Sequence, residues 1–239
     1  MTIKDAGALK GLHVAVIADL HAGAPFIDEG KVARVVDLTN SAHPDLILLA
    51  GDYVITHVLG GRHMPIEYIA RLLQPLSAPL GVYAVLGNHD RWEDAAHIAA
   101  VLRRAGIAVL DNDAAIIATH RGPLYLVGIG DYFTHGADPA RALAKLPLGQ
   151  RALCLTHSPD VFPELDVRCH LTIAGHTHGG QVDLPFFGRL IVPSKYGQRY
   201  AAGTRHEGQN YLFTSTGIGT SIVPLRFRVP PEISLLEIR

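Results

Sequence analysis

From His13 to Ala105 the chain alternates between short apolar runs and longer amphipathic segments. The apolar runs His13–Ala18, Leu46–Ala50 and Val82–Leu86 each have the length and composition of a strand buried on both faces. The segments between them predict helices: one that follows Asp28 as its N-cap, one at about 65–74 and one at about 93–105. Repeated strand–helix units favour parallel strands joined by right-handed crossovers.

After Ile107 the pattern changes to short apolar runs separated by turn residues. These runs predict strands at 108–110, 114–119, 124–128, 152–156, 171–174, 211–215 and 233–238, with one helix at 139–146. No internal repeat, low-complexity segment or linker divides the sequence, so we expect residues 1–239 to form a single domain.

Five short polar stretches lie behind apolar runs and carry most of the functional information. In chain order they are Asp19-Leu20-His21, Gly51-Asp52, Gly87-Asn88-His89-Asp90, Thr156-His157-Ser158 and Gly175-His176-Thr177-His178. The carboxyl ends of neighbouring strands converge in an α/β fold, so these side chains are expected to meet at one site. Oxygen donors mixed with imidazoles, without a thiolate, suit divalent ions such as Mn, Fe or Zn. Taken singly, each stretch could also be a turn, a helix cap or a solvated histidine pair.

Because the polar stretches come from both halves of the chain, the two halves should each supply a sheet to one site. We therefore predict an α/β fold: a four-layer α/β/β/α sandwich of two mixed β-sheets flanked by helices.

The ordered motifs D-x-H, G-D, G-N-H-D, a lone His and G-H-x-H resemble those of the calcineurin-like metallophosphoesterase superfamily. Additional stretches are similar to its bacterial YkuE/YaeI-like phosphodiesterase branch: 126–131, 156–160, 179–181, 217–221 and 224–227. The resemblance spans about Leu12 to Ile238 and implies the metallo-dependent phosphatase fold.

The resemblance also implies two divalent metal ions and a role for each motif residue. The first ion would be held by Asp19, His21, Asp52 and His178, and the second by Asp52, Asn88, His157 and His176, so that Asp52 bridges them. His89 would be catalytic, as a donor to the phosphate or an acid for the leaving oxygen, and Asp90 would orient its imidazole.

The implied reaction is hydrolysis of a phosphodiester or phosphomonoester by in-line attack of a metal-bridging hydroxide. An alternative is a pyrophosphatase that acts on a nucleotide-linked lipid precursor such as UDP-2,3-diacylglucosamine. A third hypothesis, from another class, is a non-catalytic scaffold on the same fold, which the complete set of motif residues disfavours.

Composition and net charge limit the kinds of substrate and partner that we expect. Hydrophobic residues make up 48% and charged residues 18% of the chain, which favours a large core. The formal net charge of −1 provides no basic surface for nucleic acid, so a small-molecule or lipid-linked phosphoester is expected.

Residues 1–10 lack an apolar h-region and a twin arginine, and no run is long enough to span a bilayer. We expect a cytoplasmic protein, with peripheral membrane contact as an alternative.

Several other residues allow two interpretations. Cys154 and Cys169 lie in apolar surroundings and are expected to be buried free thiols rather than a disulfide. The stretch 184–193 could be a lipid- or substrate-docking lip, but its Pro and Gly residues favour a hairpin packed on the sheet. Arg226 could reach a phosphate, and His57 and His63 could line a substrate entrance.

Overall fold

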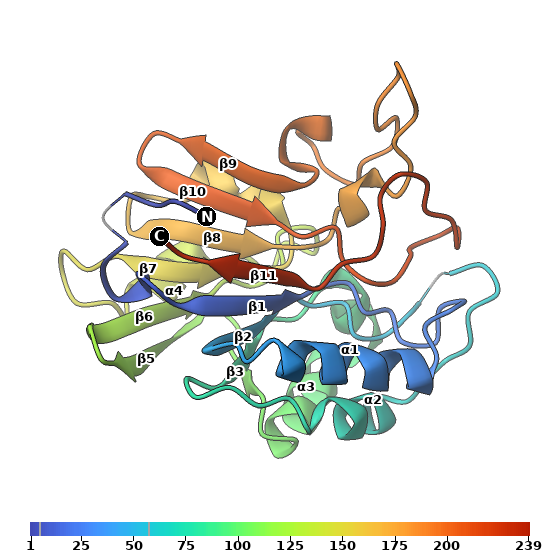
Figure 1. The fold of residues 1–239 in the computed structure, drawn as a ribbon, viewed down its shortest axis with the longest axis horizontal. Helices are drawn as coiled ribbons and strands as arrows, with labels where there is room; N and C mark the ends of the chain where they lie inside the picture. The colour runs from blue at the N-terminus through green and yellow to red at the C-terminus, as the bar shows by residue number, and fades with distance from the viewer. Residues whose placement is uncertain (5, 57) are drawn as a thin grey trace.

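The computed structural model describes residues 1–4, 6–56 and 58–239 (Figure 1). One sheet has five strands in the order β11-β1-β2-β3-β4. The bounds are β11 Ser234–Glu237, β1 His13–Ile17, β2 Leu46–Leu49, β3 Val82–Ala84 and β4 Ala108–Val109. Strands β1 to β4 are parallel, as predicted for β1 to β3, and β11 pairs antiparallel with β1.

The other sheet has six strands in the order β5-β6-β7-β8-β10-β9. The bounds are β5 Asp113–Thr119, β6 Gly122–Gly128, β7 Ala152–Leu155, β8 Cys169–Ala174, β10 Asn210–Thr214 and β9 Gly203–Glu207. The four central strands are parallel and the two edge strands antiparallel. The sequence did not predict β9, because its residues Gly-Thr-Arg-His-Glu are polar and mostly exposed.

The two sheets pack face to face and helices cover their outer faces (Figure 1). Val16 of β1, Leu126 of β6 and Ile173 of β8 belong to the apolar layer between the sheets. Helices α1 (Glu29–Ser41), α2 (Ile66–Leu73) and α3 (Asn88–Arg104) cover the first sheet. Short α4 (Pro139–Leu143) and the 3-10 turn Pro159–Glu164 cover part of the second. The predicted sandwich is confirmed.

Helix α1 begins where the sequence predicted, and α3 begins earlier. The carboxylate of Asp28 accepts the N–H of Lys31 at 2.8 Å, as an N-cap does. Helix α3 starts at Asn88 rather than Glu93, because Asp90 in its first turn accepts the N–H of Gly87 at 2.8 Å. At Asp94 the backbone is extended, which divides α3 into two segments. Asn88 and His89 therefore lie in the first turn of a helix.

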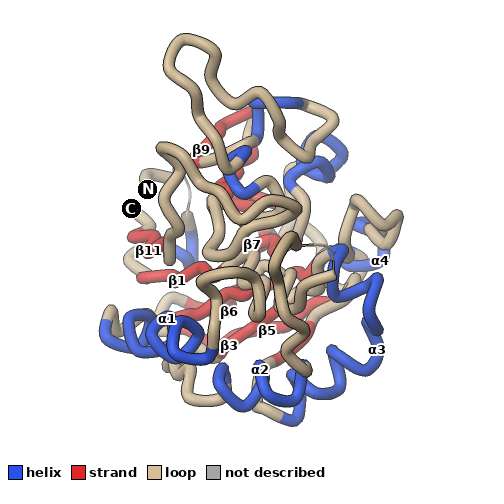
Figure 2. Tube along the Cα trace, turned by 90° about the vertical axis from the view of Figure 1, so that its right-hand side faces the viewer, coloured by secondary structure: helices blue, strands red, loops and turns tan. Residues whose placement is uncertain are grey.

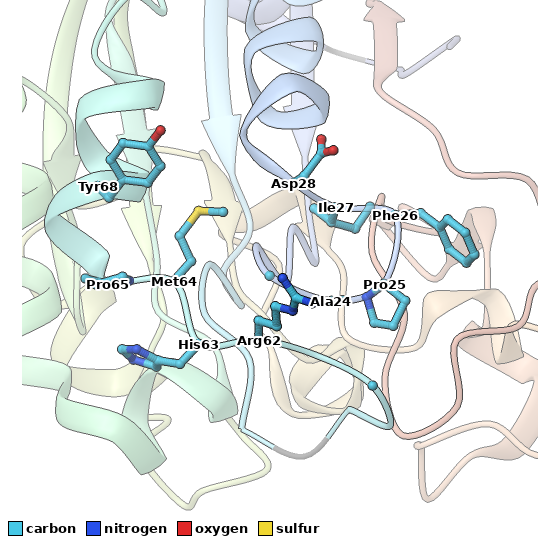
Figure 3. Close-up of a pocket in the computed structure, with 12 residues that line it drawn as sticks. Ala24, Pro25, Phe26, Ile27, Asp28, Arg62, His63, Met64, Pro65 and Tyr68 are labelled. Carbon is cyan, nitrogen blue, oxygen red and sulfur yellow. The ribbon is translucent and has the colours of Figure 1, made fainter.

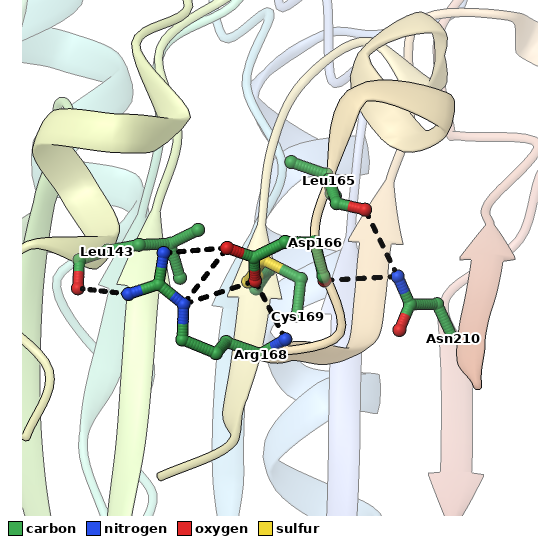
Figure 4. Close-up of a disulfide and its surroundings, with 7 residues drawn as sticks. Leu143, Leu165, Asp166, Arg168, Cys169 and Asn210 are labelled. Atoms are coloured by element: carbon green, nitrogen blue, oxygen red, sulfur yellow. Dashed lines mark hydrogen bonds and ion pairs between the residues drawn. A yellow bond between two sulfur atoms is a disulfide. The ribbon is translucent and has the colours of Figure 1, made fainter. Parts of the chain in front are cut away.

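Cys154 and Cys169 form a disulfide between β7 and β8, so the expectation of free thiols is wrong. The two strands are neighbours with an irregularity in their register at Ala152 and Leu153, and the Cα atoms of the two cysteines lie 5.5 Å apart. Figure 4 shows Asp166 and Arg168 paired beside this bond.

The stretch 184–193 contains the predicted hairpin, in which Leu184 pairs with Gly188. It projects from the molecule at the upper right of Figure 1 instead of packing on the sheet. Phe186, Phe187 and Ile191 are exposed there. Among the residues described, no helix is both long and apolar enough to cross a membrane.

Candidate dinuclear metal site

All of the predicted site residues are buried at one end of the two sheets, where parallel strands end. Asp19 and His21 follow β1, Asp52 follows β2 and Asn88 follows β3. From the second sheet, His157 follows β7, and His176 and His178 follow β8. Figure 2 looks onto this end, where loops cover the strands.

Five of these residues adopt left-handed backbone conformations. The φ angles are 50° for Asp19, 44° for His21, 58° for Asp52, 70° for His176 and 49° for His178. Residues other than glycine rarely adopt positive φ, and such conformations cluster at functional sites. Strands β1, β2 and β8 are thus each followed by a sharp turn at a site residue.

One cluster joins the turn after β1 to the turn after β8. The Nε2 atoms of His21 and His178 are 3.2 Å apart. Nε2 of His178 is 3.9 Å from Oδ1 of Asp19, and Nε2 of His21 is 3.5 Å from Oδ2 of Asp52. These are the four residues predicted to hold the first ion.

The second cluster contains the four residues predicted for the second ion. Nε2 of His157 is 3.1 Å from Oδ1 of Asn88, 3.2 Å from Oδ2 of Asp52 and 3.1 Å from Nδ1 of His176. The same Oδ2 atom of Asp52 therefore faces both clusters, which is the position required of a bridging carboxylate.

Hydrogen bonds behind two of the histidines prepare them to bind a cation. Nδ1 of His157 is 2.7 Å from the carbonyl oxygen of Ala50, and Nδ1 of His21 is 3.2 Å from that of Val54. A carbonyl can only accept, so in the neutral ring the proton resides on Nδ1 and the lone pair on Nε2 faces the cluster. Carboxylate oxygens and imidazole nitrogens within 4.8 Å of one another, with the amide oxygen of Asn88 3.1 Å from Nε2 of His157, fit divalent cations.

Burial makes this arrangement unfavourable without added positive charge. Burial raises the pKa of Asp19 to about 7 and lowers the pKa of His21 to about 4. Burial also lowers the pKa of His176 to about 3. At His157 burial lowers the pKa, but the Asp52 carboxylate outweighs it and raises the pKa to about 10. The protonation of His157 thus depends on the Asp52 carboxylate. Bound cations would stabilise the ionised carboxylate of Asp19, which burial disfavours.

His89 lies beside the first cluster. Its ring centroid is 4.6 Å from that of His21, and its backbone N–H donates to Oδ1 of Asp52 at 2.9 Å. The N–H of Thr56 donates to Nδ1 of His89 at 3.3 Å, and the Thr56 hydroxyl lies 2.7 Å from the same atom. Because Nδ1 accepts, the proton of the neutral ring is on Nε2.

Asp90 acts on the backbone instead of contacting the His89 imidazole as expected. Its carboxylate accepts N–H groups from Asp52 and Gly87 at 2.8 Å and from Tyr53 at 2.9 Å. Burial raises the pKa of Asp90 to about 7. The carboxylate thereby joins the turn after β2 to the first turn of α3, and Thr56 contacts the imidazole.

Arg226, which the sequence left open as a phosphate contact, bonds the protein backbone. Its guanidinium donates to the carbonyl oxygens of Gly219 at 2.6 Å and Thr216 at 2.8 Å, and lies 3.4 Å from Nδ1 of His178. All three of its nitrogen atoms contact acceptors of the protein. Arg226 thus supports the loop behind His178.

Two aromatic residues that the sequence did not single out border the site, one beside His89 and one beside His176. The ring of Trp92 is 5.1 Å from His89, and the ring of Phe133 is 5.1 Å from His176 and 6.1 Å from Trp92. Both are half exposed. The position of Trp92 three residues after His89, on the same helical face, was the available signal. Nothing in the sequence around Phe133 indicated its position.

Of the two histidines proposed for a substrate entrance, His57 lies outside the described residues. His63 lies in the wall of a crevice of about 450 Å³ between the loop after β1 and the loop before α2 (Figure 3). None of the metal-site residues borders this crevice, so it is separate from the clusters. The entrance role of His63 stays a prediction.

Comparison with known proteins agrees with this geometry. Residues 12–180 match the family described as calcineurin-like phosphoesterase. The chain belongs to this family. It is therefore a metal-dependent phosphoester hydrolase by class.

Individual relatives cover most of the chain. It is 35% identical to phosphodiesterase YaeI of Escherichia coli, over 94% of this chain and 81% of that protein. It is 26% identical to UDP-2,3-diacylglucosamine pyrophosphatase LpxG of Chlamydia trachomatis, over 96% of this chain and 84% of that protein. The solved structure of phosphopantetheinyl hydrolase from Mycobacterium tuberculosis resembles it in fold with a TM-score of 0.53, at 14% identity, and covers 87% of this chain and 89% of that one.

Proposed function

We propose that this protein hydrolyses a phosphodiester at a dinuclear centre held by Asp19, His21, Asp52, Asn88, His157, His176 and His178. The observation that carries the proposal is the shared position of Asp52, whose Oδ2 atom lies 3.5 Å from His21 and 3.2 Å from His157. Two bound divalent cations, Mn, Fe or Zn, would supply an activated water nucleophile and neutralise charge on the phosphoryl oxygens. We also propose that residues 1–239 work as one domain, since β11 completes the sheet that begins with β1.

We assign His89 a catalytic role, although its imidazole also forms a group with His21 and Asp52 in which the ligand atoms lie within 4.8 Å of one another. The N–H of Thr56 keeps Nδ1 as an acceptor, so Nε2 carries a proton that can be donated to a phosphoryl oxygen or to the departing alkoxide. Asp90 supports this role through the backbone: it holds the turn of Asp52 against the first turn of α3, where His89 begins.

The surroundings favour a substrate with an apolar or extended substituent. Trp92 and Phe133 form a half-exposed aromatic pair beside His89 and His176. Phe133 also borders a crevice of about 290 Å³ together with His135 and Pro193. A diester has a second substituent that such a wall can contact, which a simple monoester lacks.

A second candidate is hydrolysis of the pyrophosphate in a nucleotide-linked lipid precursor. The relative LpxG, which acts on UDP-2,3-diacylglucosamine, matches over nearly the whole chain and favours it. Both reactions would use the same metal centre and differ in what the aromatic wall contacts.

One assay series tests both candidates. Metal-loaded protein is given bis(p-nitrophenyl) phosphate, p-nitrophenyl phosphate or UDP-2,3-diacylglucosamine, with Asp52→Asn protein as the blank. We expect the diester to be hydrolysed faster than the monoester. Faster turnover of the lipid precursor would favour the second candidate, and no hydrolysis above the blank would contradict both.

A further inference from the structure

Four segments beyond the metal-site turns carry exposed apolar side chains. They are 23–27, 58–62, 182–192 and 220–228, which we call the rim. Its exposed apolar residues are Phe26, Leu59, Phe186, Phe187, Leu190, Ile191, Ile222, Val223, Leu225 and Phe227. Scattered apolar residues are ordinary on a protein surface, but a contiguous group marks an interaction site.

Backbone hydrogen bonds join the four segments into one surface. The N–H of Arg62 donates to Gly23 at 2.8 Å, and the N–H of Leu59 donates to Ile222 at 2.9 Å. The N–H of Asp183 donates to Phe227 at 3.0 Å. In Figure 1, where the colour gives the residue number, these segments lie on the right, the end toward which β1 and β8 run.

Three of the exposed side chains stand on left-handed backbone. Phe26 has φ 72° and is 82% exposed, Ile222 has φ 63° and is 70% exposed, and Phe186 has φ 70° and is fully exposed. In Figure 3 the ring of Phe26 points away from Met64 and Tyr68. Glycine and asparagine tolerate this conformation, whereas a bulky or β-branched residue is strained in it. Large apolar side chains that are exposed on left-handed backbone indicate a function for these side chains.

The charge of the rim differs from that of the whole protein. With Arg226 left out because its guanidinium contacts loop carbonyls inside the protein, the rim contains Arg62, Arg189 and Arg228 against one acidic residue, Asp183. Its net charge is +2, while the whole chain carries −1. Asp183 lies 3.8 Å from Arg189, and Arg62 and Arg228 are exposed. Apolar tips interspersed with cations are typical of proteins that lie on an anionic membrane.

We infer that the rim docks on an anionic lipid bilayer, with Phe26, Phe186 and Ile222 inserted among the acyl chains and Arg62 and Arg228 against the headgroups. Docked in this way, the end of the protein that holds the metal site faces the membrane surface. This inference does not depend on which phosphoester is hydrolysed.

The test measures co-sedimentation with vesicles of phosphatidylcholine with or without phosphatidylglycerol. A triple variant replaces the three exposed residues on left-handed backbone by asparagine, which tolerates positive φ. Its substitutions are Phe26→Asn, Phe186→Asn and Ile222→Asn. A matched control, Leu148→Asn with Val167→Asn, removes exposed apolar side chains before β7 and β8, at the opposite end of these strands.

The wild type and the control should bind vesicles that contain phosphatidylglycerol, and binding should weaken as salt is added. The triple variant should bind at least about tenfold more weakly, since burial of each such side chain is favourable. Its melting temperature should not fall, and its turnover of a water-soluble diester should be unchanged. Arg62→Gln with Arg228→Gln should reduce the preference for phosphatidylglycerol.

Three results would overturn the inference: no vesicle binding by the wild type, equal binding by the triple variant, or equal loss in the control. A dimer in lipid-free solution that the triple variant abolishes, without vesicle binding, would make the rim a contact between copies of this chain instead.

Discussion

The Nε2 atoms of His21 and His178 lie 3.2 Å apart, although the two residues are 157 positions apart along the chain. The Nδ1 atom of His21 lies 3.2 Å from the carbonyl oxygen of Val54, and burial lowers the pKa of His21 to about 4. Burial also lowers the pKa of His178 well below its usual range. Two buried neutral rings with their nitrogen atoms face to face are best satisfied by a cation between them.

The first prediction concerns the second cluster. His176→Ala should bind one metal ion fewer per chain than the wild type, because Nδ1 of His176 lies 3.1 Å from Nε2 of His157. Metal content after dialysis, measured by mass spectrometry, provides the readout. His97→Ala is the control, since this exposed histidine pairs with Glu67 far from the site. Equal metal content in His176→Ala and the wild type would remove His176 from the ligand set.

The second prediction separates metal binding from proton donation at His89. His89→Asn should keep its metals and lose about 10²–10⁴-fold in turnover, the usual effect of removing a general acid. The loss should be smaller for nitrophenyl esters, whose leaving group needs little protonation, and larger for alkyl esters.

Thr56→Val is the matched control for His89. It removes the hydroxyl 2.7 Å from Nδ1 of His89 but keeps the N–H that makes Nδ1 an acceptor. It should therefore lose far less activity than His89→Asn. Undiminished hydrolysis of both kinds of ester by metal-loaded His89→Asn would disprove the catalytic role.

The third prediction uses the space around Gly87. A Cβ atom here would overlap Oδ1 and the backbone N of Asp52, so Gly87→Ala must displace the shared carboxylate. We expect a loss of bound metal and a fall in stability of about 1–3 kcal/mol. In Gly30→Ala the added methyl meets only an Asp28 oxygen, at 3.5 Å, and helix α1 should gain up to about 1 kcal/mol. Unchanged metal content in Gly87→Ala would contradict the close packing of this turn.

The fourth prediction concerns the aromatic wall. Phe133→Ala should raise the KM for an aromatic diester about two- to tenfold with little change in kcat, because the ring would bind the ground state and the transition state alike. Ile116→Ala, an exposed apolar residue on edge strand β5, provides the control. An unchanged KM in Phe133→Ala would remove this side chain from the substrate site.

The sequence predicted that the proposed metal-site residues would meet, because each lies behind an apolar run and parallel strands bring their carboxyl ends together. Asp19 and His176 illustrate this: they come from different sheets, yet Asp19 accepts the N–H of His176 at 2.9 Å. The start of α3 was predicted too late, because Asp90 stabilises the first turn through a hydrogen bond that composition does not reveal.

Contacts made by loops could not be predicted. The contact between Thr56 and His89 and that between Phe133 and His176 depend on how loops from different strands fold over the site. The pairing of Cys154 with Cys169 depends on the strand order and on a local irregularity in register. None of these is encoded in the spacing of residues along the chain.

The last prediction concerns that disulfide. It closes a loop with a sequence separation of 15 residues and joins β7 to β8, the strands that lead to His157 and His176. A cross-link that closes a loop of this length lowers the entropy of the unfolded chain, which adds about 3 kcal/mol to the free energy of unfolding. The double variant Cys154→Ala, Cys169→Ala should therefore lower the free energy of unfolding by about that amount. Its metal content and its turnover at low temperature should stay near those of the wild type, because the two cysteines are not among the proposed site residues. Denaturant unfolding with and without the bond provides the measurement. Two reactive thiols in denatured, unreduced wild-type protein would show that the bond does not form.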